Sequence, residues 1–297
     1  MKEKSKNIFY ILIFFAMFGW GLSWVSVKVL SNYINEFEMV FFRFTLTTLT
    51  MIPIILYLKK SFRIDVKTLA LVTLTSVVML AYMKYFFLGT KLGTASLGGA
   101  FVTTLIPIIT FIFMVLLGKK SLRSKDIFAL GLGALGVLTI LDVWHTSLAL
   151  VLIPQNLYFA LAAFLWATLT ILSSKNSKVS PIIFTFYMYI ITSLMAVVFF
   201  VDFSLIKYES FDNIFWLNII GVTLLSTTYA NTIYFLGIEK LGASEVSSFA
   251  FLVPFFAIGL ASIFLDEKIN TSIIVGTVLA LVAVKLLNDI KFKKKAE

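Results

Sequence analysis

Two basic residues, Arg43 and Lys84, lie inside long apolar stretches, where a charged side chain needs a reason to be. A charge at the centre of a membrane costs about 2.5 to 3.5 kcal/mol on insertion scales. Each residue could face an internal cavity and bind a carboxylate or phosphate group, or could extend to the lipid headgroups. Thr47 and Thr50 follow Arg43 at i+4 and i+7 and give it a polar helix face, whereas the face of Lys84 is less polar. For Arg43, a structural role in anchoring its helix is a third alternative.

Aromatic and amide side chains in the middle of other apolar stretches could complete such a site. Trp20 and Trp166 lie away from the stretch ends, where membrane proteins usually place tryptophan. They could stack on a planar ring or a cation, and ordinary packing is the competing explanation. Asn231 shares a polar stripe with Ser226 and Thr227 and could hydrogen-bond a ligand or another helix. The predicted binding residues are Trp20, Arg43, Tyr82, Lys84, Thr103, Trp166, Tyr229 and Asn231.

Two prolines, Pro107 and Pro254, interrupt apolar stretches that correspond to each other in the two halves of the chain. Proline lacks a backbone N–H, so it kinks a helix and frees a carbonyl group. Paired interruptions of this kind indicate a binding site near the middle of a membrane. We predict that both prolines are gating kinks, with ordinary tolerated bends as the alternative. Thr103, one helical turn before Pro107, is placed to satisfy the freed groups or to touch a ligand.

Several kinds of chemistry are excluded or disfavoured by the sequence. The chain has no cysteine for disulfides, thiolate metal sites or nucleophiles, and its single histidine, His145, argues against a histidine metal site. Gly131, Gly133 and Gly136 match the spacing of a dinucleotide-binding motif, but they lie in an apolar stretch without a preceding strand, so close helix packing explains them better. We predict no catalytic residue, enzyme activity, cofactor or metal, and scattered charges argue against nucleic acid binding.

The elements that must position these residues are membrane-spanning helices. The chain is 60% hydrophobic and 13% charged, whereas soluble domains contain about 25% charged residues. Ten apolar stretches each approach the roughly 20 residues of a spanning helix, and their continuous runs differ from the alternating pattern of barrel strands. We predict that the first is a retained span and not a signal peptide. The stretches cover residues 8–28, 37–58, 68–90, 95–117, 127–142, 155–174, 181–201, 214–237, 243–265 and 271–288.

Most of the 25 Lys and Arg residues collect in alternate loops, and this asymmetry orients the helices. Cytoplasmic loops are enriched in Lys and Arg. The opposite loops contain only Lys28, Lys91, Lys207 and Lys268. The N-terminal segment carries three lysines and the C-terminal tail four. We therefore predict a multi-pass protein of the cell membrane with both termini in the cytoplasm. Its net charge of +10 predicts attraction to anionic lipid of the inner leaflet.

A weak internal repeat divides the chain into two halves. Residues 85–96, YFFLGTKLGTAS, resemble residues 234–244, YFLGIEKLGAS, and Pro107 lies as far before Lys119 as Pro254 lies before Asp266. An odd number of helices reverses the second copy, so we predict an all-α integral membrane fold of ten helices in two inverted five-helix repeats. The expected boundaries are 1–142 for the first repeat, 143–154 for an external junction loop, 155–290 for the second repeat and 291–297 for a basic cytoplasmic tail.

This arrangement resembles the EamA-like branch of the drug/metabolite transporter superfamily over almost the whole chain. The resemblance rests on the paired halves, the run Trp20-Gly21-Leu22-Ser23-Trp24 with Lys28 closing the span, Arg43 early in the second span, and Leu265-Asp266-Glu267-Lys268-Ile269 after the ninth. It implies a secondary carrier of small metabolites, such as amino acids, vitamins or nucleotide derivatives, with a central cavity and alternating access. The family's usual Gly-Glu after the fourth span is Lys119-Lys120 here, so the first half lacks that acid.

The resemblance and the residues together predict a permease that moves a small organic metabolite across the cell membrane. The favoured function is export of an amino acid or a similar zwitterionic or anionic metabolite. Uptake of a vitamin such as riboflavin is the alternative, and a membrane subunit without transport activity is the alternative of another class. Proton coupling, exchange and facilitated diffusion all stay open, as does the formation of a homodimer.

Overall fold

The computed structural model describes residues 3–145, 147–175, 179–241 and 248–287, and the regular structure in these ranges is helical. The start of the ninth predicted span, 243–247, and the predicted tail, 291–297, lie outside the described residues. The helices are α1 (Glu3–Leu30), α2 (Glu36–Tyr57), α3 (Val66–Leu92), α4 (Ala95–Leu116), α5 (Ser124–Ile140), α6 (Leu148–Val151), α7 (Pro154–Ser173), α8 (Pro181–Phe199), η1 (Tyr208–Ser210), α9 (Asn213–Gly221), η2 (Val222–Asn231), α10 (Thr232–Leu241), η3 (Ser248–Leu252), α12 (Val253–Leu265) and α13 (Thr271–Leu287).

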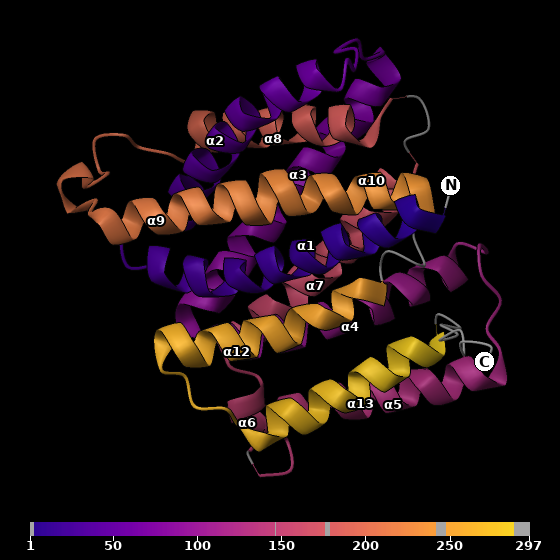
Figure 1. Ribbon diagram of the computed structural model, residues 1–297. Helices are drawn as coiled ribbons and strands as arrows, with labels where there is room; N and C mark the ends of the chain where they lie inside the picture. The colour runs from indigo at the N-terminus through magenta and orange to yellow at the C-terminus, as the bar shows by residue number, and fades with distance from the viewer. Residues whose placement is uncertain (1–2, 146, 176–178, 242–247, 288–297) are drawn as a thin grey trace.

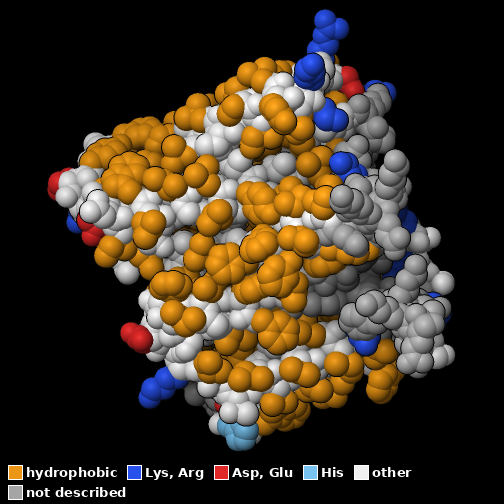
Figure 2. Space-filling model, in the orientation of Figure 1, with side chains coloured by type: hydrophobic (Ala, Val, Ile, Leu, Met, Phe, Trp, Pro, Cys, Tyr) orange, Lys and Arg blue, Asp and Glu red, His pale blue; other side chains and the backbone are white. Residues whose placement is uncertain are grey.

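The helices have the lengths and composition of a multi-pass membrane protein. Seven described helices are long and apolar enough to cross a membrane, with the helix Asn213–Gly237 counted as one, and α12 and α13 are shorter apolar helices. α5, which corresponds to the fifth predicted span, is a helix of 17 residues with an acidic residue, Asp126, in its first turn. On the face in view in Figure 2, hydrophobic side chains cover the middle, and charged side chains lie toward the ends. The predicted all-α membrane fold is therefore confirmed at this level.

Short polar side chains fix where several helices begin. Asn35 accepts hydrogen bonds from two backbone N–H groups in the first turn of α2, and the Glu38 carboxylate accepts one from the Asn35 N–H, which completes a capping box. Asp65, Thr94 and Asp212 accept hydrogen bonds from backbone N–H groups in the first turns of α3, α4 and α9. These helix starts are thus determined by local signals in the sequence.

Helices of the two halves pack against each other in a set of matching pairs (Figure 1). α1 packs on α12 and η2, and α7, the first long helix of the second half, packs on α4 and α3. α2 packs on α8, α4 on α12 and α5 on α13. This set of pairs is therefore unchanged when the halves are exchanged. α1 begins and α13 ends at the right in Figure 1; we call this the terminal end of the bundle and the opposite end the distal end.

α5 and α13 approach closely at Gly136 and Gly276. A Cβ atom added to Gly136 would lie 2.6 Å from the Ala280 nitrogen and 2.8 Å from the Gly276 oxygen. Gly133 also faces neighbouring side chains, whereas a Cβ atom at Gly131 would meet nothing within 4 Å. Close packing, which small residues permit between membrane helices, explains Gly133 and Gly136 as predicted. It does not explain Gly131.

The helix that corresponds to the eighth predicted span is widened in its middle. η2 is a π-helix of 10 residues between the α-helices α9 and α10, and π-helical turns are rare and frequent at functional sites. The Thr227 hydroxyl donates to the Val222 carbonyl, five residues earlier. Ser226, Thr227 and Asn231 are all buried. The polar stripe predicted from the sequence therefore faces the interior of the bundle.

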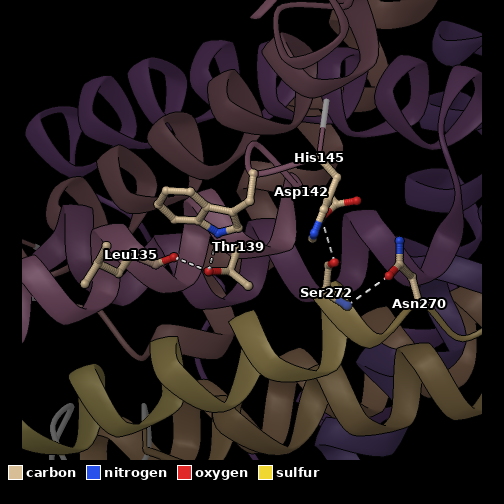
Figure 3. Close-up of polar contacts among 7 residues, drawn as sticks. Leu135, Thr139, Asp142, His145, Asn270 and Ser272 are labelled. Atoms are coloured by element: carbon tan, nitrogen blue, oxygen red, sulfur yellow. Dashed lines mark hydrogen bonds and ion pairs between the residues drawn. The ribbon is translucent and has the colours of Figure 1, made fainter. Parts of the chain in front are cut away.

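The predicted junction between the halves contains the short helix α6. Beyond the end of α5, the Ser272 hydroxyl at the start of α13 donates to the Asp142 carboxylate at 2.8 Å, and His145 Nδ1 lies 2.7 Å from the same oxygen (Figure 3). The Asn270 side chain accepts a hydrogen bond from the Ser272 N–H and begins α13 (Figure 3). This small polar cluster ties the end of the first half to the last helix of the second.

Candidate functional site

A cavity of about 700 Å³ lies between the two halves of the bundle, a size typical of sites for small molecules. Residues of α1, α2, α3, α4, α7, α8, the η2–α10 helix and the η3–α12 helix line it. It extends from Trp24 and Phe86, which are buried, to Lys119 and Ser174, which are exposed at the terminal end. The cavity therefore reaches the surface at the terminal end of the bundle.

Arg43 on α2 is the basic residue that lines the deep part of this cavity, and it is only 7% exposed. Its Nε donates to the Thr227 hydroxyl at 2.7 Å, and its Nη2 donates to the Ser226 hydroxyl at 3.2 Å. Thr47, predicted to share its face, donates to the Arg43 carbonyl. Among the described residues that line the cavity, none is Asp or Glu. A buried charge without an opposite partner is costly, so this guanidinium is suited to bind an anionic group.

Three polar side chains beside Arg43 form a chain of hydrogen bonds across the bundle. Trp20 Nε1 on α1 donates to Asn231 Oδ1 at 2.8 Å, and Asn231 Nδ2 donates to the Tyr189 hydroxyl on α8 at 2.6 Å. The Tyr189 ring is 1% exposed and stacks on Phe44, with ring centroids 4.8 Å apart. Asn231 thus uses both ends of its amide in contacts between helices, and all three members of the chain line the cavity.

Aromatic rings form a continuous wall of the cavity. Trp166 on α7 packs against Tyr82 and Trp20, with ring centroids 4.7 and 5.9 Å apart. Tyr234 on α10 lies 4.8 Å from the Trp20 ring. Such rings provide flat apolar contact area and a negative π face for a planar group or a cation. The two tryptophans predicted from the sequence are therefore neighbours, although they lie far apart in the chain.

The entrance at the terminal end carries positive charge. Lys119 is exposed there, and Lys120 is partly buried. Lys120 Nζ donates to the Leu287 carbonyl at the end of α13, at 2.9 Å, and lies 4.4 Å from the centre of the Phe111 ring. Partial burial lowers the pKa of Lys120, and the nearby Asp126 carboxylate opposes this effect. An anionic molecule that approaches the cavity therefore meets a favourable electrostatic potential.

Two charged side chains hold the distal end together. Lys28 Nζ donates to the carbonyls of Lys91 and Gly93 at the end of α3, at 2.8 and 2.6 Å. The Glu267 carboxylate accepts hydrogen bonds from two N–H groups in the first turn of α4, at 2.8 and 2.9 Å, and from the Ser96 hydroxyl at 2.6 Å. A cation at a helix C-terminus and an anion at a helix N-terminus both complement the helix dipole. The connection from α3 to α4 is therefore fixed from both sides.

We call these contacts of Lys28 and Glu267 the distal clamp. Large aromatic rings fill the space between the distal clamp and the cavity. Trp24 packs on Phe86 and Phe159, with ring centroids 4.6 and 6.0 Å apart. A Cβ atom at Gly98 would lie 2.5 Å from the Trp24 ring and 2.6 Å from the Phe159 ring, so only glycine leaves room for them. This ring layer closes the cavity toward the distal end.

The structure brings most of the predicted binding residues together. Those that line the cavity are Trp20, Arg43, Tyr82, Thr103, Trp166 and Asn231, together with the predicted kink residue Pro107. They come from six different helical segments, so the sequence alone could not place them side by side. Pro107 lies inside α4, which continues through it.

Three predicted residues lie elsewhere. Lys84 is half-buried on α3, and its Nζ lies 5.8 and 6.0 Å from the centres of the Phe37 and Tyr85 rings. Tyr229 donates its hydroxyl to the Leu12 carbonyl on α1. Pro254 lies in the first turn of α12, a position that proline tolerates. None of the three is among the described residues that line the cavity, and their roles in binding and gating stay predictions.

Tyr189 is a cavity residue that the sequence prediction missed. It lies in an aromatic and aliphatic run of α8, PIIFTFYMYII, in which no polar stripe or spacing distinguishes it from its neighbours. Its role could be identified only from the position of its partner, Asn231, which lies 42 residues further along the chain on another helix. Phe44 and Phe86 were missed for the same reason.

The fold and the site define a multi-pass membrane protein with a central cavity between two equivalent halves. The EamA-like transporter family matches residues 7–142 and again residues 154–288. The chain therefore belongs to the EamA-like transporter family, with two EamA domains, as the sequence resemblance predicted. Membership of a transporter family implies a small-molecule substrate and a protein that is not an enzyme.

Two further comparisons agree with this assignment. The chain is 24% identical over 291 residues to an uncharacterized transporter, YyaM, of Bacillus subtilis (strain 168), an alignment that covers 95% of this chain and 93% of that protein. A crystal structure of another protein shares the fold with a TM-score of 0.67 and 14% sequence identity, over 95% of this chain and 97% of that chain. Both alignments span nearly the full length of the proteins compared.

Proposed function

We propose that this protein is a secondary transporter that moves a small organic metabolite across the cell membrane by alternating access. The observation that carries the proposal is a cavity of about 700 Å³ that reaches the surface at one end and is closed by packed rings at the other. A carrier needs a binding site that is accessible first from one side of the membrane and then from the other. The matching helix pairs of the two halves provide the equivalent contacts that such an exchange of access requires.

The proposal includes the arrangement of the chain in the membrane. Ten spans form two inverted five-helix repeats, and α9, η2 and α10 together make the eighth. Both termini lie in the cytoplasm, because Lys and Arg collect at the terminal end. Anionic lipid of the inner leaflet then surrounds the basic entrance to the cavity.

The orientation supports a direction of transport, and the charges of the cavity support a class of substrate. The cavity reaches the surface at the terminal end, so a cytoplasmic molecule has access to it, which supports export. Arg43 provides a cation without an acidic partner among the described cavity residues, and the lysines at the entrance attract anions. These features support an amino acid or a similar zwitterionic or anionic metabolite as the substrate.

A vitamin with a flat ring system, such as riboflavin, is the second candidate substrate, and its transport would be uptake. The observation that favours it is the wall formed by Trp20, Trp166, Tyr82 and Tyr234, because these rings could stack on a planar group. A membrane subunit without transport activity is the alternative of another class.

The proposal is tested by measuring which metabolite the protein moves. Intracellular and extracellular metabolite pools of cells that express the protein are compared with those of matched cells that carry the empty vector. Metabolites that change are then tested by counterflow in proteoliposomes that contain the purified protein. We expect saturable, substrate-specific flux, and its response to an imposed proton gradient determines the coupling. Folded, correctly oriented protein that moves none of these metabolites would support the subunit alternative.

A further inference from the structure

Two buried donor groups in the deep part of the cavity have no complementary acceptor among the described residues. They are the Tyr189 hydroxyl hydrogen and the unused N–H groups of Arg43. Tyr189 was not a predicted site residue, and its hydroxyl has a hydrogen bond only to Asn231 among the described contacts. The Arg43 side chain lies within electrostatic reach of both the Tyr189 and Tyr82 hydroxyl groups.

The direction of the Tyr189 hydrogen bond follows from its neighbours. An indole nitrogen can only donate, so the atom of Asn231 that faces Trp20 Nε1 at 2.8 Å must be the amide oxygen. The amide nitrogen of Asn231 therefore faces Tyr189 and donates to its oxygen at 2.6 Å. Because that oxygen accepts, its own hydrogen is left to donate to another group. Asn231 and Trp20 thus set the donor state of Tyr189 without using its hydrogen.

Arg43 is oriented in a similar way, by hydrogen bonds that use only some of its N–H groups. Its guanidinium has five N–H groups, and two of them bind the Thr227 and Ser226 hydroxyls on η2. The Thr227 hydroxyl donates to the Val222 carbonyl, so it acts as an acceptor toward Arg43. The π-helix therefore holds the guanidinium from one side, and the remaining N–H groups are available on the cavity side.

We infer that Arg43 and Tyr189 form an oxyanion site that binds the carboxylate of the transported molecule, and that Asn231 is a positioning residue. The inference rests on the proposed transport function and makes its substrate more specific. Buried donors without acceptors select an acceptor-only group, and a carboxylate accepts from both an arginine and a hydroxyl. An ammonium group has no acceptor for these donors, and a neutral amide has one acceptor oxygen where a carboxylate has two and cannot balance the charge of Arg43. The rest of the molecule then lies against the aromatic wall formed by Trp20, Tyr82, Trp166 and Tyr234.

The first test measures recognition without transport. The thermal stability of the purified full-length protein is measured with each proteinogenic L-amino acid and with the corresponding amino-acid amide, at neutral pH. We expect at least one free acid to raise the melting temperature and its amide to have no comparable effect. If no acid stabilises the protein more than its amide, the inference is wrong, whatever the outcome of the flux measurements.

The second test removes the hydroxyl group and keeps the ring. Tyr189→Phe preserves the stack on Phe44, and loss of one hydrogen bond to a charged acceptor predicts an affinity about tenfold weaker for the stabilising acid. Tyr187→Phe is the matched control, because Tyr187 lies on the same helix, bonds the Phe62 carbonyl and does not line the cavity. We expect this control to keep the affinity of the natural protein.

A third variant separates the positioning role of Asn231 from the direct contact between Tyr189 and the carboxylate. Asn231→Leu removes the donor that fixes the Tyr189 oxygen, so Tyr189 can turn its hydrogen away, and the difference in affinity between acid and amide should shrink. An unchanged preference for the acid in both Tyr189→Phe and Asn231→Leu, with saturable transport intact, would overturn the oxyanion site and leave the transport function standing. Absence of any metabolite flux through the natural protein would instead contradict the proposed function.

Discussion

At the scale of single residues, Asp212 makes a contribution to stability that depends on pH. Its carboxylate caps α9 by accepting from the Phe215 N–H and also accepts from the Tyr33 hydroxyl in the connection between α1 and α2. The bond from the Phe215 N–H is the largest cause that lowers the pKa of Asp212 from its ordinary value. A carboxyl group with a lowered pKa in the folded state stabilises that state above the pKa of the unfolded state, about 3.9 for aspartate.

We therefore predict that Asp212→Asn, which keeps an acceptor for the helix cap and removes the charge, melts at a lower temperature than the natural protein at pH 7. The two melting temperatures should converge as the pH falls below about 3.9 and through the lower pKa of the folded state. Thermal melting of the purified protein at a series of pH values measures this difference. Glu209→Gln, an exposed residue at the same end, should behave as the natural protein does at every pH. A difference for Asp212→Asn that persists undiminished in acid would contradict the account.

The residues of the site were easier to predict from the sequence than the residues that they contact. Arg43 was identified because a charge in an apolar stretch is costly and because Thr47 and Thr50 follow on its helix face. The same cost argument identified Lys84, which lies beside the Phe37 and Tyr85 rings and does not line the cavity. The free-energy cost of a charge in an apolar stretch indicates that the charge needs a compensating interaction. It does not indicate which kind of interaction provides the compensation. Tyr189 carried no such signal, because a tyrosine in an aromatic helix is ordinary until its hydrogen bond to Asn231 is known.

At the scale of helices, the contacts of Lys28 and Glu267 form a clamp at the distal end, where packed rings close the cavity. Glu267 follows α12 and binds the first turn of α4, so it joins the two halves directly. The corresponding position in the first half is Lys120, which binds the end of α13. These two corresponding positions therefore carry opposite charges, and the acidic one, Glu267, lies at the closed end of the cavity together with Lys28.

We predict that Glu267→Gln opens the distal end more often. Each hydrogen bond to a charged group is worth about 1.5 to 3 kcal/mol, so weakening one changes the ratio of the two states roughly ten- to hundredfold. The chain has no natural cysteine, so Ile106→Cys in the cavity wall can be labelled alone by a membrane-impermeant thiol reagent. Labelling from the distal side should increase in the Glu267→Gln protein.

Asp266→Asn is the matched control for the distal clamp. Asp266 is the exposed neighbour of Glu267, and no hydrogen bond of its side chain is described. Its substitution should leave the labelling rate of Ile106→Cys unchanged. Equal labelling rates in the Glu267→Gln and Asp266→Asn proteins would show that the carboxylate of Glu267 does not hold the distal end closed.

The contact between α5 and α13 leads to a separate prediction about stability. A Cβ atom at Gly136 would collide with the backbone of α13, so Gly136→Ala should lower the free energy of unfolding by about 1 to 3 kcal/mol. Gly131→Ala, with nothing within 4 Å of the added atom, should be neutral or stabilising by up to about 1 kcal/mol, because alanine favours the helix. Melting temperatures of the two variants in one detergent measure the contrast. Equal destabilisation would mean that α5 and α13 do not touch at Gly136.

The helices were predictable to different degrees. Apolar runs located the long spans to within a few residues, because the thickness of the membrane fixes their length, and Asn35 and Asp65 mark the starts of α2 and α3 as local caps. The π-helix η2 was not predicted, because an inserted residue in a helical stretch leaves the overall hydrophobicity unchanged. Pro254 was expected within a span, and it lies in the first turn of α12. Its position depends on where the preceding 3₁₀ turn, η3, ends.

At the scale of the whole molecule, the two halves explain why the cavity exists. Helices of each half pack on helices of the other, as in the pairs α1 with α12 and α4 with α7, and the cavity lies between the halves. The duplication was visible in the sequence through the two similar stretches at 85–96 and 234–244. The identity of the facing side chains was not visible, because contacts between halves join residues more than a hundred positions apart, such as Trp20 and Asn231.

In the proposed mechanism, one cavity is accessible from the two sides of the membrane in turn. The most direct measurement is the labelling of Ile106→Cys from each side of oriented vesicles, with and without a transported metabolite, and with the exposed α7 residue Leu161→Cys as a control facing away from the cavity. We predict fast labelling from the terminal side without metabolite, a shift of labelling between the two sides when metabolite is added, and no labelling of the control. Labelling that stays on one side in every condition, although the metabolite is transported, would contradict alternating access through this cavity.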